Sequence, residues 1–151
     1  MILSATRNDV KNIVHVITLS IQACTLDHQE NPEIIQKWLS NKTVENISIW
    51  MKNSFAFIYK KEGEVIGFIL LSKAGVLLLN YILPDQQGVG IGSALLNQVI
   101  DTAKEKSIQK IALESTLTAK EFYLSKKFKI IEEIYENNQL VAYRMERELF
   151  S

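Results

Sequence analysis

The chain has 151 residues, of which 47% are hydrophobic, and its seventeen basic side chains balance seventeen acidic ones. A chain of this length can bury a sizeable core by itself, so we expect residues 1–151 to form one domain. The balanced charge provides no field that would collect nucleic acid or coat an anionic membrane. No apolar run approaches the roughly 18 residues of a membrane-spanning helix, and the early charged residues do not fit a signal peptide, which favours a cytoplasmic location.

The single cysteine, Cys24, excludes an internal disulfide bond and a zinc site with several cysteines. Cys24 and His28 are four residues apart and could lie on one face of a helix. A metal ion would need at least one further ligand, and the sequence identifies none. We therefore expect no bound metal, and we assign Cys24 to the protein interior.

We expect a short strand and then helices in the first third of the chain. Residues 2–5 are typical of a strand. Apolar residues then recur at helical spacing over residues 10–21. After a polar break at residues 27–32, two short helices are expected on either side of residues 41–43, with Thr43 as the cap of the second.

Three consecutive strands are predicted in the middle of the chain, over residues 55–59, 65–71 and 76–83. Short turns with glycine separate them, which favours antiparallel pairing. The third strand, VLLLNYIL, has almost no polar alternation. We therefore expect it at the centre of the sheet with both faces covered.

An amphipathic helix over residues 91–103 and a strand over residues 108–113 follow the third strand. Thr118 and Glu121 then form the pattern of a capping box, which predicts that a helix starts here. The buried face of that helix would carry Ala119, Phe122 and Tyr123.

The chain is predicted to end in a hairpin of residues 128–135 and 140–149, in which apolar and charged side chains alternate. The order of elements is then strand, helices, three strands, helix, strand, helix and two strands. This order predicts a mixed α/β domain built on one layer of sheet.

Glycines at positions 88, 90 and 92 stand between the third strand and the helix that follows it. A strand that turns into a helix in this way points several backbone N–H groups at one spot, where the helix dipole adds partial positive charge. Glycine allows positive φ angles and lets a ligand touch the backbone. The loop therefore predicts a site for phosphate oxygens.

Three other interpretations of the loop compete. A nucleoside-triphosphate loop would end in Gly-Lys-Ser or Gly-Lys-Thr, and Gly92-Ser93 has no lysine. A dinucleotide fingerprint is nearly matched, with Glu114 where a ribose-binding acid belongs, but only one strand-helix-strand crossover follows the loop. A tight turn without a ligand needs fewer than three glycines at alternate positions.

The pattern Gln87-x-x-Gly90-x-Gly92, taken with STLTAKEFYLSKKF at residues 115–128, closely resembles the GNAT superfamily of N-acetyltransferases. The resemblance is strong in the glycine loop, weaker in the second segment, and extends to the order of elements over the whole chain. It implies a single-domain α/β fold of the α+β type, in which helices flank a mixed, mostly antiparallel sheet with a splayed central strand pair. It also implies that the loop holds the pyrophosphate of acetyl-coenzyme A.

The resemblance further implies the parts of an active site. The strand of residues 76–83 would bulge near Tyr81 and Ile82 and part from the next strand, with the pantetheine arm in the gap. The backbone N–H of Ile82 would bind the acetyl carbonyl, and Leu83 would contact the arm through its main chain. Tyr123 matches the tyrosine that protonates the departing thiolate, since a phenol with a pKa of about 10 keeps its proton at neutral pH. The implied contacts to the coenzyme are completed by Gln87, Gly88, Val89, Gly90, Gly92, Ser93 and Thr116.

The sequence departs from the family pattern in three respects. Thr116 stands where many members have asparagine, and Lys127 stands where many have glycine. The central strand offers no glutamate, which serves as the base in some members. The candidates for the base are therefore a water ordered by Asn80 and the N-terminal side chains His28, Asp27 and Glu30.

These observations predict an acetyl-coenzyme A-dependent N-acetyltransferase, in which an amine attacks the donor directly in a ternary complex. A covalent intermediate on Cys24 is not required for that reaction. The acceptor would be an amine on a small molecule or a peptide, and a monomer and a homodimer both remain open. The alternative function is a non-catalytic coenzyme A sensor, which the missing carboxylate on the central strand favours.

Overall fold

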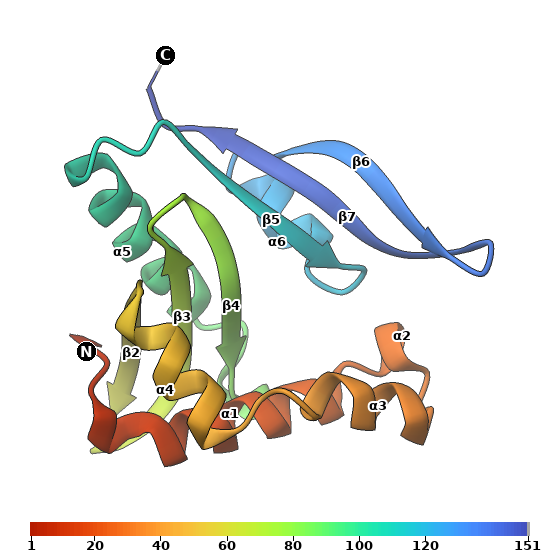
Figure 1. Ribbon diagram of the computed structural model, residues 1–151, viewed down its shortest axis with the longest axis horizontal. Helices are drawn as coiled ribbons and strands as arrows, with labels where there is room; N and C mark the ends of the chain where they lie inside the picture. Colours follow the sequence, from red (N-terminus) through yellow and green to blue (C-terminus); the bar gives the residue numbers. More distant parts are fainter. Residues whose placement is uncertain (151) are drawn as a thin grey trace.

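The computed structural model describes residues 1–150 of the chain, except for the side chain of residue 26. Within these residues, seven strands form one sheet in the order β1-β2-β3-β4-β5-β7-β6 (Figure 1). Neighbouring strands are antiparallel except for β4 and β5, which are parallel. The predicted mixed, mostly antiparallel sheet is confirmed, with residue 151 of the expected domain outside the described residues.

The order of the elements also agrees with the prediction, and no helix within residues 1–150 is long and apolar enough to cross a membrane. The strands are β1 (Ile2–Ser4), β2 (Ser54–Lys61), β3 (Glu64–Ser72), β4 (Val76–Ile82), β5 (Lys110–Thr116), β6 (Lys129–Glu136) and β7 (Gln139–Glu148). The helices are α1 (Val10–Ala23), α2 (Thr25–His28), α3 (Pro32–Leu39), α4 (Val44–Lys52), α5 (Ile91–Glu105) and α6 (Lys120–Ser125), with short 3-10 helices η1 (Arg7–Asp9) and η2 (Pro84–Gln86).

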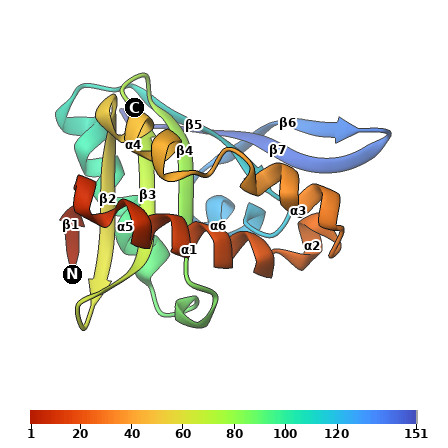
Figure 2. The same cartoon turned by 60° about the horizontal axis from the view of Figure 1, so that its bottom comes forward.

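Helices cover both faces of the sheet. Helices α1 and α4 pack on one face of β2, β3 and β4, and α5 and α6 lie on the opposite face (Figures 1 and 2). Fully buried Ile13 and Phe68 belong to the first core, and fully buried Leu95 and Ile111 belong to the second. The two cores hold the single layer of sheet between them, because each helix buries one apolar stripe against it.

Strand β3, rather than β4, is covered on both faces. All residues from 65 to 71 are buried, with Phe68 in the core under α1 and Ile69 in the core under α5. In β4, which does occupy the centre of the strand order, Val76 is 39% exposed and Leu78 is 46% exposed. The prediction of two covered faces is therefore wrong for β4. Leu78 lines the cavity at the opening, whereas Val76 is exposed at the end of β4 that pairs with β5.

The opening lies between β4 and β5. These strands pair at two positions, Val76 with Ala112 and Leu77 with Leu113, although both strands continue beyond these pairs. The splayed central strand pair that the family resemblance implies is therefore confirmed. The two arms of the sheet meet at these pairs and separate toward the carboxyl ends of both strands.

The bulge in β4 is at Leu78. Leu70 and Leu71 of β3 pair with the residues on either side of Leu78, which leaves Leu78 as the extra residue. Tyr81 and Ile82 pair regularly with β3, so the expected bulge near these two residues is wrong. A bulge bends its strand and increases the local twist, which helps β4 to turn away from β5.

Two predicted helix caps have different outcomes. Thr43 caps α4 as expected, since its Oγ1 accepts a hydrogen bond of 3.1 Å from the Asn46 N–H. The expected capping box at Thr118 is wrong, because α6 begins at Lys120 and has no side-chain cap. The Thr118 hydroxyl instead donates to the carboxylate of Asp27, a contact that the local sequence pattern does not indicate.

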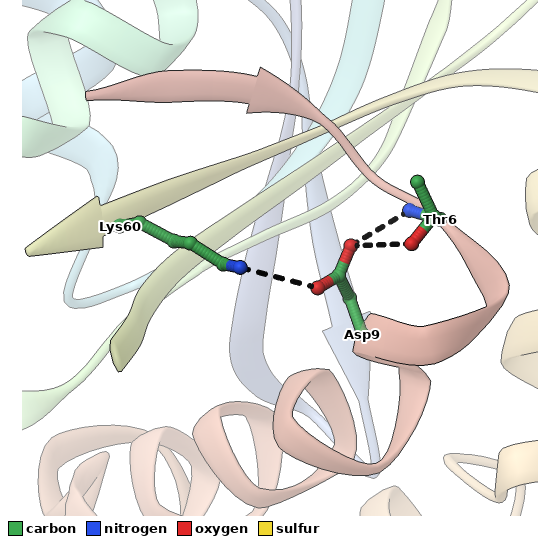
Figure 3. A network of polar contacts seen from close by, with 3 residues as sticks. All are labelled: Thr6, Asp9 and Lys60. Carbon is green, nitrogen blue, oxygen red and sulfur yellow. Dashed lines mark hydrogen bonds and ion pairs between the residues drawn. The ribbon is translucent and has the colours of Figure 1, made fainter. Parts of the chain in front are cut away.

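The start of α1 is tied to the sheet by a buried carboxylate, shown in Figure 3. The backbone N–H and the hydroxyl of Thr6 donate to Asp9 Oδ2 over 2.8 and 3.0 Å. Lys60 Nζ on β2 lies 3.8 Å from Asp9 Oδ1. Asp9 is only 8% exposed, so these contacts compensate for burying its charge. They fix the direction in which α1 crosses the sheet toward the opening.

Candidate active site

A cavity of about 540 Å³ occupies the place where β4 and β5 part. Its walls come from residues 77–82 of β4, residues 113–116 of β5, the glycine loop, and the side of α6 that carries Phe122 and Tyr123. Ser20 and Cys24, near the end of α1, complete the lining. Five segments of the chain therefore meet at the opening in the sheet.

The glycine loop forms the start of α5 at one end of this cavity. Gly88 has a φ angle of +81° and Gly90 has one of +89°, so both adopt the left-handed conformation that glycine favours. Gly90 is the N-cap of α5, and no side chain caps the helix. The N–H groups of the first helical turn have no partner within the helix, which leaves them available to an anion. The predicted positive φ angles are confirmed at these two glycines.

Gly92 serves a different purpose in the loop. A Cβ atom at this position would lie 3.1 Å from Ile82 Cδ1 and 3.5 Å from Phe122 Cζ. The glycine therefore lets α5 approach the end of β4 and the ring on α6. Ser93 also lines the cavity, as expected.

Two neighbours of the loop differ from their expected places. Val89 is 68% exposed and does not line the cavity. The N–H of Leu83 donates to Ile66 O over 2.9 Å, so this main-chain group pairs with β3 and does not face the gap. Gln87 lines the cavity as expected and donates through Nε2 to Ile82 O over 3.3 Å.

Ile82 directs its backbone groups into the opening. In an antiparallel ladder, successive residues present their N–H and C=O groups to opposite edges of the strand. Since Leu83 pairs with β3, the groups of Ile82 point to the side where β5 has departed. Its carbonyl oxygen accepts hydrogen bonds from Ser20 Oγ, at 2.7 Å, and from Gln87 Nε2. The Ile82 N–H therefore lies on the open edge of β4.

Tyr123 and Asn80 meet inside the cavity. Tyr123 is 6% exposed, and its hydroxyl oxygen accepts a hydrogen bond of 2.9 Å from Asn80 Nδ2. Burial raises the pKa of Tyr123 to about 12, despite the opposing effect of this hydrogen bond. The phenol is therefore neutral at physiological pH, and its own O–H proton remains free to be donated elsewhere. Phe122 and Phe128 hold the ring edge-to-face, with centroids 5.2 and 5.5 Å away.

The Asn80 side chain retains an unused acceptor. Among the described residues, Asn80 Oδ1 is a buried side-chain atom without a hydrogen-bond partner. Buried polar atoms are rarely left unpaired, because desolvation without a partner costs roughly 1–3 kcal/mol. An unpaired oxygen beside a cavity therefore suggests that a ligand group or a water completes this site.

Cys24 and Tyr81 both carry protons in the folded protein. Burial and the charge of Asp27 raise the pKa of the Cys24 thiol, whose Sγ donates to Ser20 O over 3.1 Å. Burial raises the pKa of Tyr81 to about 12. A protonated thiol is a poor nucleophile, which agrees with a reaction that needs no covalent step on cysteine.

His28 does not line the cavity. It is 1% exposed, and its Nδ1 accepts a hydrogen bond of 2.8 Å from the Glu30 N–H. Its Nε2 therefore carries the proton and donates to Gln22 O over 3.1 Å. Both ring nitrogens are used to hold the backbone around α2, so we do not retain His28 as a base. The carboxylate of Asp27 is also occupied, by the Leu117 N–H and the Thr118 hydroxyl.

Glu114 is a cavity residue that the sequence pattern did not assign to this chemistry. It is the acidic residue among those that line the cavity, and it is exposed. The alternation along β5 places Glu114 and Thr116 on the face opposite Leu113. That alternation was visible in the sequence, but the opening of the sheet beside it was not. Thr116 also lines the cavity, and its Oγ1 accepts a hydrogen bond of 3.2 Å from the Ala119 N–H.

The cavity fits a long thioester donor with a diphosphate group. The uncapped start of α5 supplies N–H groups for phosphate oxygens, and the open edge of β4 supplies N–H and C=O groups for an amide-bearing arm. Within the described residues, no group of three or more histidine, cysteine, aspartate or glutamate side chains could hold a metal ion.

Comparisons with known proteins point to the same chemistry. Residues 22–149 match the family model described as an acetyltransferase (GNAT) domain. No curated protein sequence matches the chain.

Three solved structures illustrate the similarity of the fold. A GCN5-related N-acetyltransferase, also described as an aminotransferase of class II, from Rhodopseudomonas palustris has a TM-score of 0.86 and 16% identity, covering 98% of this chain and 94% of that one. The PaiA N-acetyltransferase from Thermoplasma acidophilum, in complex with coenzyme A, has a TM-score of 0.84 and 20% identity, with 98% of each chain covered. YncA from Salmonella typhimurium, with its cofactor acetyl-CoA, has a TM-score of 0.76 and 14% identity, covering 100% of this chain and 94% of that one.

At these identities the structures establish the shared fold, and the family model covers most of the sequence. The chain belongs to the GNAT family of acetyltransferases, whose acetyl donor is acetyl-coenzyme A.

Proposed function

We propose that this protein transfers the acetyl group of acetyl-coenzyme A to an amine on a small molecule or a peptide, by direct attack in a ternary complex. One observation carries the proposal. The uncapped, glycine-rich start of α5 and the Tyr123–Asn80 pair open into the same cavity at the gap between β4 and β5. An anion site and a proton donor in one cavity match a donor that carries both a diphosphate and a thioester.

The glycine loop would hold the diphosphate. The N–H groups of the first turn of α5 would bind its oxygens, with Ser93 beside them and Gln87 linking the loop to β4. Positive φ angles at Gly88 and Gly90 shape the loop, and the absence of side chains lets the ligand reach the backbone. When bound, acetyl-coenzyme A supplies an acetyl group activated as a thioester.

The Ile82 N–H would stabilise the charge that develops on the acetyl oxygen. This group lies on the open edge of β4, and the Ile82 carbonyl is anchored by Ser20 and Gln87. A donor held in place before the reaction pays no reorganisation energy during it, which is why backbone N–H groups suit oxyanion sites.

Tyr123 would act as the general acid. Its neutral phenol can donate a proton to the departing sulfur, while Asn80 Nδ2 holds the hydroxyl oxygen in place. The free Asn80 Oδ1 would bind the attacking amine or a water next to it.

Glu114 would receive the proton of the acceptor amine. Its carboxylate lines the cavity on the β5 side and is solvent-exposed, so it can attract a protonated amine and accept its proton directly or through water. This assignment also weakens the sensor alternative, which rested on the lack of a carboxylate on β4. A carboxylate from the neighbouring strand reaches the same cavity.

Thiol release from acetyl-coenzyme A tests the proposal. The purified protein is incubated with a panel of small amines and peptides, and free thiol is measured for wild type, Tyr123→Phe and the control Tyr135→Phe. Tyr135 is 57% exposed on β6 and does not line the cavity, so its variant should match wild type. If wild type binds acetyl-coenzyme A but thiol release equals the enzyme-free background with every acceptor, the sensor function replaces the proposed one.

A further inference from the structure

The last part of α1 and the helix α2 span the open end of the cavity. Near one end of this segment, the buried Ser20 donates through Oγ to Ile82 O on β4 over 2.7 Å. Near the other end, Asp27 Oδ1 accepts a hydrogen bond of 2.6 Å from the Leu117 N–H, and its Oδ2 accepts one from the Thr118 hydroxyl. Leu117 and Thr118 belong to the turn that follows β5. One short segment is therefore bonded both to β4 and to the turn that follows β5.

The rest of α1 is fixed to one arm of the sheet. Ile13, Val16 and Ile17 are fully buried against β3 and β4. Figure 1 shows α1 running beneath these strands, with α2 next to the turn after β5. The backbone leaves the helical conformation at Cys24, where φ is −80° and ψ is 58°, and this bend directs α2 toward the other arm. Asp27 thus reaches the β5 arm from a helix that is anchored to the β4 arm.

The width of the opening has few other determinants. β4 and β5 share two paired positions at the closed end, and beyond them no ladder hydrogen bonds join the strands. On the face of α5 and α6, the arms are linked by the close approach of Gly92 to Phe122 and by the hydrogen bond from Asn80 Nδ2 to the Tyr123 hydroxyl. On the face of α1, Asp27 crosses to the turn after β5, and Ser20 holds the end of α1 against Ile82 on the β4 arm.

We propose that Ser20 and Asp27 are positioning residues that brace the gap between β4 and β5 at the width the donor requires. The role of this brace in the reaction rests on the proposed function. Ser20 holds the residue whose N–H faces the acetyl oxygen, and Asp27 holds the turn that leads into α6 and Tyr123. Together with the Asn80–Tyr123 hydrogen bond, the brace therefore sets the distance between the oxyanion site on one arm and the proton donor on the other.

A brace makes a prediction that two separate local roles do not make. Ile13, Val16 and Ile17 keep α1 on the β4 arm in either variant, but Asp27 can hold the turn after β5 at a fixed distance from Ile82 only while Ser20 keeps the end of α1 against Ile82. Losing either contact loosens that distance, and losing the second adds little. Two independent residues that share no partner would instead show additive effects. Non-additivity between Ser20→Ala and Asp27→Ala is therefore the signature to measure.

The test is a double-mutant cycle on the affinity for acetyl-coenzyme A, measured by calorimetry. Each single variant should weaken binding about tenfold, equivalent to about 1.4 kcal/mol and typical of one lost hydrogen bond. The double variant should also stay near tenfold, whereas independent effects would multiply to about a hundredfold. A hundredfold loss in the double variant, or wild-type affinity in both single variants, would overturn the proposal.

Matched controls separate the brace from general damage. Thr18→Val removes a hydroxyl from the same helix that bonds only to Val14 O within α1, over 2.8 Å, and Asp101→Asn removes an exposed charge from α5. Both controls should bind acetyl-coenzyme A as wild type does. If Asp27→Ala does not fold, Thr118→Val takes its place in the cycle, since it removes the hydroxyl that donates to Asp27 from the turn after β5 and leaves α2 unchanged.

Hydrogen exchange at the Leu117 amide tests the brace without any turnover. Asp27→Ala should speed exchange of this amide about tenfold or more, because the carboxylate that protects it is gone, while the amides of β3 stay protected. Unchanged exchange would overturn the brace even in an active enzyme. Faster exchange of the Leu117 amide together with a non-additive affinity cycle supports the brace, even if no amine is acetylated. In that case the proposed function fails and the brace does not.

Discussion

The phosphate site can be tested with a matched pair of glycines. Gly90 in the loop and Gly63 in the turn between β2 and β3 have φ angles of +89° and +82°. A Cβ atom added at either position would have no protein atom within 4 Å. Alanine should therefore destabilise the fold by a similar amount at both sites, about 1–2 kcal/mol, from the left-handed backbone alone. The two variants differ only in what surrounds them when a ligand binds.

At Gly90 the added methyl group would stand where diphosphate oxygens approach the start of α5. Hydrogen bonds to charged groups contribute roughly 1.5–3 kcal/mol each, so the loss of one such bond should weaken binding about 10- to 100-fold. Gly63→Ala should bind coenzyme A as wild type does, because its turn lies outside the cavity lining.

Calorimetry with coenzyme A measures the affinities, and urea unfolding measures the stabilities of the same two variants. The reasoning is refuted if Gly90→Ala binds coenzyme A as tightly as Gly63→Ala does at equal stability. Equal loss of binding in both variants would also refute the reasoning. Strain in the left-handed backbone, rather than a lost contact between the ligand and the start of α5, would then explain the weaker binding.

Three further changes have distinct expected results. Tyr123→Phe should lower kcat about a hundredfold with little change in the affinity for coenzyme A, since general acids contribute roughly 10²–10⁴-fold, and thiol release checks this. Because the pKa of Tyr123 is raised from 10.0 to about 12, its neutral form stabilises the fold below pH 10, and this contribution is lost as the pH rises toward 12. Urea unfolding between pH 8 and 11 should therefore show a smaller alkaline loss of stability in Tyr123→Phe than in wild type. Glu114→Gln should lower kcat/KM for amines about a hundredfold at neutral pH and recover as the pH approaches the pKa of the amine, as rate profiles against pH would show. Asp9→Ala should cost about 1–2 kcal/mol in unfolding free energy through the lost contacts with Thr6, with coenzyme A affinity unchanged, which the same unfolding and calorimetric measurements check.

Features set by nearby residues were predictable from the sequence. The glycines at 88 and 90 adopt positive φ, the apolar period gives α1 and α5, and Thr43 caps α4. In each case the residues that decide the structure lie within a turn or two of it. Local periodicity and turn chemistry therefore suffice for them.

Features set by distant residues were mispredicted or not seen. Thr118 has the pattern of a cap, but its hydroxyl bonds to Asp27, which is 91 residues away in the sequence. His28 was a candidate base, but here the deciding contacts are local: it is buried, and its ring nitrogens bond to backbone groups of Gln22 and Glu30, six and two residues away. A side chain with a plausible local role takes another one when tertiary contacts offer a better partner.

The sequence by itself determined that a strand ends in a glycine-rich loop, that a helix follows, and that a tyrosine stands on the next helix. Only the tertiary structure decided where β4 and β5 part, and therefore which side chains share the cavity. The reason is that the separation of two strands depends on pairing and packing across the whole sheet. Leu78 at the bulge, Glu114 beside the gap, and Ser20 and Asp27 at its open end acquire their places from that separation.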